Sequence, residues 1–527
     1  MPRRRDLAPV AMPAKTTVKK AKNGTVYVYL TTRAYRDAKG RPTSDEALIG
    51  KLAPDQVSLI PNQRYGEFFG TPPQGIVESS VGFGDAATLW LLADRLGITR
   101  GLEATVGGLT SAVVTVASYM VGHGNVMCHI DSYCEENWTP ADIRLDSPRT
   151  TELFTELDFP IRAGFFRYWI SLRQEDEYIA YDVTSVSTYA GGIEDAEWGH
   201  NRDQEELTQV NLGMFLGETT RLPVYYATYQ GSVLDKTHLP VMMESAKALG
   251  ITRVRFVFDR GFVTKDNLTY VADNHLSFVT ALPITRVIAR ELIDQCAADI
   301  HSSLNRVLGE NIYAWTQPTR IDGLDLNAHV FYSPYKAAGE EEILYAKLAR
   351  LEHELAAMES SPRVTKRYRD YFTVATHPGD IAFTRDHTKI DTRLAHAGYF
   401  ILITNDHSLT PVEVLRTYRD KDIIEKAFSQ LKNHLDFHRM RTHYTHTSDG
   451  KLFTAFIALI LRSAIREALS ASADTARMSV GTAMRELHKL KRVTYHDGTI
   501  LHTIVTKTQR QILTALDIDP HILTAMN

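Results

Sequence analysis

The stretch Tyr178–Ser187 reads YIAYDVTSVS, a run of apolar and β-branched residues with one carboxylate, Asp182, in its middle. Such a run predicts a strand that is buried in a sheet. A carboxylate on a buried strand is costly unless it is paired, hydrogen-bonded or holding a cation. The residues beside Asp182 are not turn formers, so a place at a strand end does not explain it. Asp182 is therefore a candidate functional residue.

The segments around this stretch alternate between strand and helix patterns. Three consecutive strands, a crossover helix and two further strands predict a mixed α/β sheet. The predicted strands cover 177–188, 209–220, 221–231, 253–262 and 276–283, and the predicted helix covers 237–249.

A second carboxylate closes the fourth of these strands. In VRFVFDRGF, Asp259 follows four apolar or aromatic residues and one arginine, and it precedes Arg260 and Gly261. An ordinary strand-end turn residue is one interpretation of Asp259. The other is that Asp259 and Asp182 serve the same site from two strands.

A third carboxylate, Glu425, lies on a predicted helix. Thr410-Pro411-Val412-Glu413 is a capping box with proline at the first helical position, and 418–435 continues as a helical pattern. At ~100° per residue, Tyr418, Lys421, Glu425 and Lys432 fall within roughly 60° of one another. A solvated face of i,i+4 ion pairs is the alternative, but it leaves the tyrosine unexplained.

Three carboxylates, two from strands and one from a helix, are the ligand set of a two-metal site. Such sites hold Mg²⁺ or Mn²⁺ ions ~3.5–4 Å apart and carry out in-line displacement at phosphorus. These ions prefer oxygen ligands and usually share them with substrate phosphate. The expected cofactor is therefore a pair of Mg²⁺ or Mn²⁺ ions held by Asp182, Asp259 and Glu425.

These residues resemble the DDE transposases of bacterial insertion sequences, in the IS-four superfamily branch that has a β-rich insert before the final glutamate. In that family the first aspartate lies on the first strand, as Asp182 does, and the second lies in a D-R-G-F motif, as Asp259 does. The helix signature is Tyr, two residues, Arg, three residues, Glu, six residues, Lys. The matching positions are Tyr418, Glu425 and Lys432, with Lys421 in place of the arginine. The resemblance extends to Trp198–Met214 and Gly231…Asp235, and covers about 175–470.

The resemblance implies a ribonuclease H-like core and a DNA transposase that uses metal ions for 3′-end cleavage at terminal inverted repeats and for strand transfer to target DNA. It implies transposon-end and target double-stranded DNA as partners, and a homodimer in a synaptic complex. DNA-phosphate contacts are expected from Tyr418, Lys421, Lys432 and Arg260. A non-catalytic DNA-binding repressor or domesticated derivative, and a structure-specific nuclease of the same fold, remain alternatives.

The patterns also predict a division of the chain. A flexible basic arm over 1–23 precedes a hairpin that pairs Thr25–Leu30 with Ala47–Leu52, and a long helix is expected near Glu340–Ser361. The predicted regions are 1–75 (basic arm and hairpin), 76–172 (helical, DNA-binding), 173–285 (catalytic core, first part), 286–408 (β-rich insertion), 409–470 (catalytic core, second part) and 471–527 (C-terminal helices).

Composition agrees with this interpretation. The formal net charge is −4, yet residues 1–52 carry 12 Lys or Arg against four acids, a local balance that suits a polyanion-binding enzyme. Three cysteines are too few for a disulfide framework, which favours a reducing compartment. The longest clean apolar run, Leu452–Leu461, is too short to span a bilayer, and the N-terminus lacks a secretory pattern. We expect a cytoplasmic, nucleoid-associated prokaryotic protein without a membrane partner.

Overall fold

The computed structural model describes residues 10–21, 24–37, 39–53, 56–69, 77–172, 177–199, 201, 203, 205–251, 255–357, 365–377 and 380–526. Contacts divide the chain into two units. The first unit comprises Met1–Glu103, Gly107–Leu153 and Ile465–Asn527, and the second comprises Ala104–Val106 and Phe154–Ala464.

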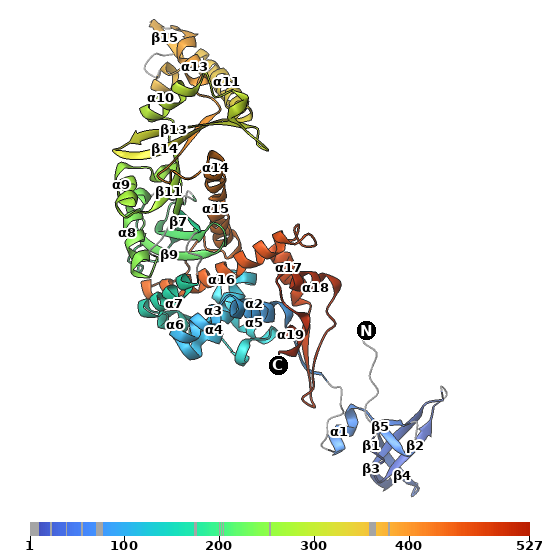
Figure 1. Cartoon of the computed structure of the whole chain (residues 1–527). Coiled ribbons are helices and arrows are strands. Elements are labelled where there is room, and N and C mark those ends of the chain that lie inside the picture. Colours follow the sequence, from blue (N-terminus) through green and yellow to red (C-terminus); the bar gives the residue numbers. More distant parts are fainter. Residues whose placement is uncertain are drawn as a thin grey trace. The chain divides into compact units, whose positions relative to one another are not determined.

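The second unit is built on a nine-stranded mixed sheet (Figure 1). Its strands, in spatial order, are β12 (Arg306–Val307), β13 (Ile312–Ile321), β14 (Leu324–Tyr332), β17 (Tyr399–Thr404), β11 (Ser277–Leu282), β10 (Arg255–Phe258), β7 (Tyr178–Thr188), β8 (Thr208–Gly217) and β9 (Pro223–Gln230). Strands β7, β10 and β11 run parallel to one another, whereas β8 is antiparallel to β7 and β9 to β8. The predicted mixed α/β sheet is thus confirmed.

The sequence explains why β7 lies inside this sheet. Every residue of β7 is buried except Asp182, which is half-buried, so the strand has no solvent-facing side. A strand covered on both faces reads as a continuous apolar run, which is the pattern of Tyr178–Ser187. Helices α8 (Asp235–Ala248) and α9 (Lys265–Asp273) lie on one face, and α14 (Pro411–Asp420) and α15 (Asp422–Ser429) lie on the other (Figure 1).

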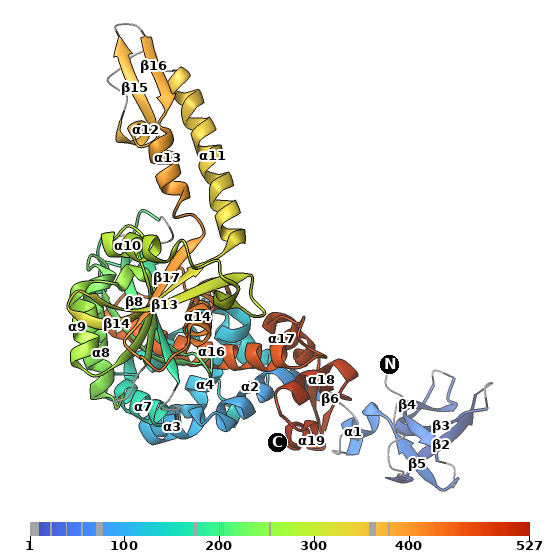
Figure 2. The ribbon, with the colours of Figure 1, turned by 45° about the horizontal axis from the view of Figure 1, so that its top comes forward.

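Part of the segment 286–408, predicted as a β-rich insertion, extends the main sheet. Strand β13 pairs with β14, β14 with β17, and β17 with β11. The part with its own small core is α11 (Pro334–Ala356), α12 (Lys366–Arg369), the hairpin β15 (Phe372–His377) and β16 (Asp380–Arg385), and α13 (His387–Leu394) (Figure 2). Helix α11 is the predicted long helix, and residues 358–361 of that prediction lie outside the described residues.

The helices that follow β17 begin as predicted but continue differently. Helix α14 starts with the predicted capping box, in which Thr410 and Glu413 bond reciprocally. The helical pattern predicted over 418–435 is confirmed for most residues, but it is divided: α14 ends at Asp420, α15 runs over Asp422–Ser429, and Gln430–His434 is a π-helical turn. A π turn is wider than an α turn, so the ~100° periodicity that placed Lys432 does not hold there. Helix α16 (Thr445–Ala471) follows.

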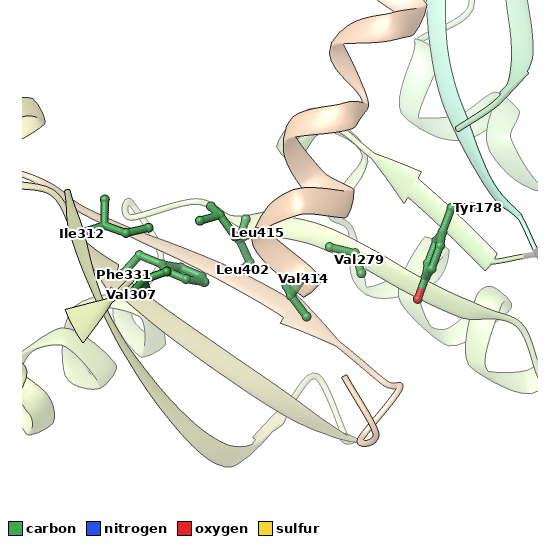
Figure 3. Close-up of a cluster of buried hydrophobic side chains, with 8 residues drawn as sticks. All are labelled: Tyr178, Val279, Val307, Ile312, Phe331, Leu402, Val414 and Leu415. Atoms are coloured by element: carbon green, nitrogen blue, oxygen red, sulfur yellow. The ribbon is translucent and has the colours of Figure 1, made fainter. Parts of the chain in front are cut away.

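Helix α14 is fixed to the sheet by an apolar cluster (Figure 3). Its Val414 and Leu415 are buried against Val279 of β11 and against Phe331 and Leu402. Burying a side chain of this size contributes about 1.5–3 kcal/mol. This packing holds α14 over the sheet, so that its last turn extends toward the end of β10.

The first unit contains two smaller sheets. One of them includes strands within residues 10–20, so the prediction of a flexible basic arm over 1–23 is wrong for these residues. Residues 10–20 carry β1 (Val10–Ala11) and β2 (Thr16–Lys20), which join the confirmed hairpin of β3 (Val26–Arg36) and β4 (Pro42–Leu52) and the short β5 (Ser58–Pro61). Strand β2 lies at the edge of its sheet, and its two lysines suit that position. Residues 1–9, 22 and 23 lie outside the described part.

Helices make up most of the rest of this unit, as predicted for the region after residue 76. They include α2 (Gly84–Arg95), α3 (Ile98–Val106), α4 (Thr110–His123) and α17 (Val480–His488). The C-terminal region is not purely helical, because β18 (Lys491–Tyr495) and β19 (Ile500–His502) form a hairpin that pairs with β6 (Val77–Gly82).

Among the described residues, one helical stretch is long and apolar enough to cross a membrane, judged by length and composition alone. It covers Ile98–His123, and 61% of its most apolar window is buried inside the structure. Burial of this kind is what core helices show.

Candidate active site

Asp182 and Asp259 lie side by side at neighbouring strands. In the parallel pair β7–β10, Tyr181 is opposite Phe258, and each aspartate follows directly. Side chains alternate along a strand, so both carboxylates point to the face opposite Tyr181 and Phe258. That face carries α14 and α15, and adjacent strands lie ~4.8 Å apart. The structure therefore brings the two strand aspartates together.

Tyr418, in the last turn of α14, bonds directly to Asp259. Its hydroxyl donates to Asp259 Oδ1 at 3.2 Å. Burial, together with the charge and hydrogen bond of Asp259, raises the pKa of Tyr418 above its usual value. The phenol therefore stays protonated at neutral pH and holds the Asp259 carboxylate in place. This is a different contact from the expected one to DNA phosphate.

Lys421 bridges two of the predicted carboxylates. Its Nζ lies 3.7 Å from Asp259 Oδ1 and 3.4 Å from Glu425 Oε1, and its side chain is only 14% exposed. The ammonium also lies over the ring of Tyr418, 5.4 Å from its centroid. A single cation thus sits between Asp259 and Glu425. Arg260, the fourth expected phosphate contact, is exposed beside them.

Glu425 lies on the face of α15 that points away from the core. Ile423, Ile424, Ala427 and Phe428 are buried where α15 packs on β7 and β8, whereas the Glu425 side chain is 62% exposed. Glu425 is joined to Asp259 through Lys421 and not by direct contact. Within the described residues, no three His, Cys, Asp or Glu side chains are close enough together to hold one metal ion.

Lys432 lies apart from these groups and has its own carboxylate. Its Nζ donates to Asp203 Oδ2 at 2.7 Å, and only 9% of its side chain is exposed. Close by, Arg439 Nη2 donates to Glu205 Oε1 at 2.9 Å. Asp203 and Glu205 were not among the predicted site residues. They lie in the motif Trp198–Met214, which was noted for its resemblance, but their partners are more than 200 residues away.

A further carboxyl pair lies at the end of α14. Burial, reinforced by the hydrogen bond and charge of Asp420, raises the pKa of Glu218 to about 7, and the nearby Arg416 and Arg221 oppose that rise. Arg221 and Arg416 pair with Asp420.

The part of the chain that carries these acids matches a known family. A family model described as a Transposase DDE domain matches residues 173–461, more than half of the chain. The chain belongs to the DDE transposase family. Among curated protein sequences, none matches this transposase at a significant level.

Two solved transposase structures show a distant likeness. The first is the piggyBac transposase synaptic complex with hairpin DNA, at 10% identity and a TM-score of 0.31; the likeness covers 72% of this chain and 59% of the piggyBac chain. The second is the Drosophila P element transposase strand transfer complex, at 12% identity and a TM-score of 0.14, covering 66% of this chain and 91% of that one. The DDE transposase thus spans less than two thirds of the piggyBac chain, and neither TM-score is high enough to indicate a shared fold.

Proposed function

We propose that this transposase cleaves the 3′ ends of its element at terminal inverted repeats and joins them to target DNA, with Asp182, Asp259 and Glu425 as its catalytic carboxylates. The observation that carries the proposal is the register of β7 and β10, which sets two aspartates side by side, with the Lys421 ammonium linking Asp259 to Glu425. Tyr418, bonded to Asp259, belongs to the same group.

The finer family placement is also a proposal. Membership of the IS-four superfamily of bacterial insertion sequences is supported by the spacing of Tyr418, Glu425 and Lys432. A ribonuclease H-like core is supported by the location of Asp182 on the first core strand and of Asp259 directly after the fourth. We assign DNA binding to the helical region 76–172, and the catalytic core to 173–285 and 409–470, with strands from the intervening segment 286–408 extending the sheet of the core.

Members of this family generally use divalent metal ions, and the residues present fit such ions in donor chemistry. The three carboxylates offer the hard oxygen ligands that Mg²⁺ and Mn²⁺ prefer, and Asp259 and Glu425 already share a cation, the Lys421 ammonium. We propose two such ions. When bound, they would stabilise the charge that develops on the scissile phosphate and make the attacking oxygen more nucleophilic.

Both chemical steps are the same displacement. In cleavage, a water oxygen forms a bond to phosphorus as the bond from phosphorus to the 3′ oxygen breaks, and the 3′ oxygen takes a proton. In strand transfer, that 3′-hydroxyl loses its proton and bonds to a target phosphorus as the bond from this phosphorus to the target's own 3′ oxygen breaks, and the released 3′ oxygen takes a proton. Tyr418 orients the Asp259 carboxylate, Lys421 limits the repulsion between Asp259 and Glu425, and the exposed Arg260 is suited to contact a phosphate.

The partners proposed are double-stranded element ends and target DNA. Two ends must be joined in one event, so we propose a homodimer that holds both ends in a synaptic complex. A cytoplasmic, nucleoid-associated location in a prokaryotic cell follows from the insertion-sequence assignment.

A gel assay with one labelled element end tests this function. The parent and the Asp182→Asn, Asp259→Asn and Glu425→Ala variants are incubated with Mg²⁺, with Mn²⁺ or with chelator. We expect 3′ nicking and strand transfer only by the parent with metal, while all four proteins bind the end. A parent that binds without nicking under any metal would instead be a DNA-binding repressor, and nicking without strand transfer would indicate a nuclease.

A further inference from the structure

Two cationic side chains and one histidine beyond Glu425 already lie beside carboxylates of the same chain. Lys432 Nζ lies 2.7 Å from Asp203 Oδ2, and His438 Nδ1 lies 3.5 Å from the same oxygen. Arg439 Nη2 lies 2.9 Å from Glu205 Oε1. The hydrogen bond from Arg439 and its charge hold the pKa of Glu205 below its usual value. These pairs connect the π turn and the segment after it with the chain that leads into β8.

The segment that carries the basic side chains and the segment that carries the carboxylates are both hydrogen-bonded to Ser187, near the end of β7, the strand that carries Asp182. The Ser187 amide donates to the His438 carbonyl at 3.0 Å, and the Met440 amide donates to the Ser187 carbonyl at 3.0 Å. On the other side, Asn201 Nδ2 donates to Ser187 Oγ at 3.0 Å, and the Asp203 amide donates to Asn201 Oδ1 at 2.8 Å. The carboxylates therefore meet the cations near the carboxyl end of β7, five residues beyond Asp182.

Carboxylate and phosphate oxygens make the same charge-assisted bonds to lysine and arginine. Arg439 and His438 are about two fifths exposed, so a ligand from solvent can reach them. Lys432 is only 9% exposed, and Asp203 covers its ammonium. A phosphate reaches Lys432 only if Asp203 moves away, and a phosphate beside an unmoved Asp203 would be repelled.

We infer that Lys432, His438 and Arg439 form a phosphate-binding row for duplex DNA, and that Asp203 and Glu205 occupy the positions of two DNA phosphates until the DNA displaces them. The inference rests on the proposed function, since it assigns His438 and Arg439 to the DNA substrate. Its consequence is that the two carboxylates compete with DNA, so the free protein binds DNA more weakly than its cations alone would allow.

Binding measurements with a labelled mixed-sequence duplex and a terminal-end duplex, in EDTA so that no cleavage occurs, test this competition. Asp203→Asn and Glu205→Gln should each bind both duplexes on the order of tenfold more tightly than the parent, since one partly buried ion pair no longer has to break. The slope of log affinity against log salt should steepen by about 0.9 for each phosphate gained. Adding Lys432→Ala should abolish the gain from Asp203→Asn.

Glu206→Gln is the matched control, because Glu206 is exposed, lies in the same segment and loses the same charge. It should change affinity less than twofold. If Asp203→Asn leaves Lys432 unpaired and the protein fails to fold, as a thermal melt would reveal, Glu205→Gln alone decides the question. Equal effects of Glu205→Gln and Glu206→Gln, or weaker DNA binding by a folded Asp203→Asn protein, would overturn the inference. A parent that binds no DNA at any salt concentration would refute the proposed function itself.

Discussion

Replacing Lys421 with methionine removes the one ammonium that lies between Asp259 and Glu425. The lysine is mostly buried, with its Nζ at 3.7 and 3.4 Å from the two carboxylates. At an effective dielectric constant of about 20, the Coulomb attraction between the ammonium and each carboxylate is at most roughly 4–5 kcal/mol before the cost of desolvation is subtracted. Measured ion pairs of this kind contribute a net stabilisation of about 1 kcal/mol. We therefore expect Lys421→Met to lower the free energy of unfolding by about 1–2 kcal/mol in the absence of divalent metal.

The same variant should respond more strongly to metal ions. A divalent cation competes with the Lys421 ammonium for Asp259 and Glu425. Removing the ammonium should therefore tighten the apparent affinity for Mn²⁺ by about tenfold, equivalent to ~1.4 kcal/mol. Thermal unfolding with increasing Mn²⁺ or Mg²⁺ measures this without any catalysis. Lys421→Met should melt about 2–4 °C below the parent in chelator and regain that difference in saturating Mn²⁺.

Lys421→Arg is the control for this prediction, because it keeps the charge between the carboxylates. It should resemble the parent in chelator and in metal. The reasoning would be refuted if Mn²⁺ raised the melting temperature of Lys421→Met no more than that of the parent.

Three further predictions concern Glu218, Tyr418 and Gly450. Because the pKa of Glu218 is raised in the folded protein, its ionisation lowers the free energy of unfolding as pH rises from about 4.5 to about 7. Glu218→Gln should therefore raise the free energy of unfolding by about 1–2 kcal/mol at pH 8 and leave it unchanged at pH 4, as measured by denaturant titration. An equal gain at both pH values would contradict this. Tyr418→Phe should slow 3′ nicking about tenfold, because Asp259 loses the hydroxyl that orients it, while a gel-shift assay should show unchanged affinity for the labelled end. A parallel loss of affinity would make Tyr418 a DNA contact instead. Gly450→Ala should destabilise the fold by more than ~2 kcal/mol in thermal unfolding, since its Cβ would meet the Phe154 carbonyl oxygen at 1.9 Å; a melt like the parent's would show that the backbone shifts easily.

Local signals in the sequence predicted local structure well. The capping box at Thr410 and the buried run at Tyr178–Ser187 were confirmed, because each depends on neighbouring residues. The Asp497–Gly498 turn between β18 and β19 was a local signal too, typical of a hairpin, yet the region was predicted as helical.

Features that depend on distant partners could not be predicted. Strand β17, within the segment 286–408, pairs with β11, and this pairing joins residues more than 100 positions apart. Helical periodicity could not predict the π turn, nor the pairing of Lys432 with Asp203. Asp182, Asp259 and Glu425 were found because carboxylates are unusual on apolar strands and beside a buried helical stripe. Their catalytic role stays a prediction.

The central claim is that these three carboxylates work as one unit, and a double variant tests it most directly. Nicking rates at a labelled element end are compared for Asp259→Asn, Glu425→Ala and the two combined, with Asp422→Asn as an exposed acid on the same helix. We predict that each single variant loses several orders of magnitude while still binding the end, that the double variant is no slower than the worse single one, and that Asp422→Asn nicks like the parent. Mild single effects that multiply in the double variant, or normal nicking by Glu425→Ala, would contradict the account.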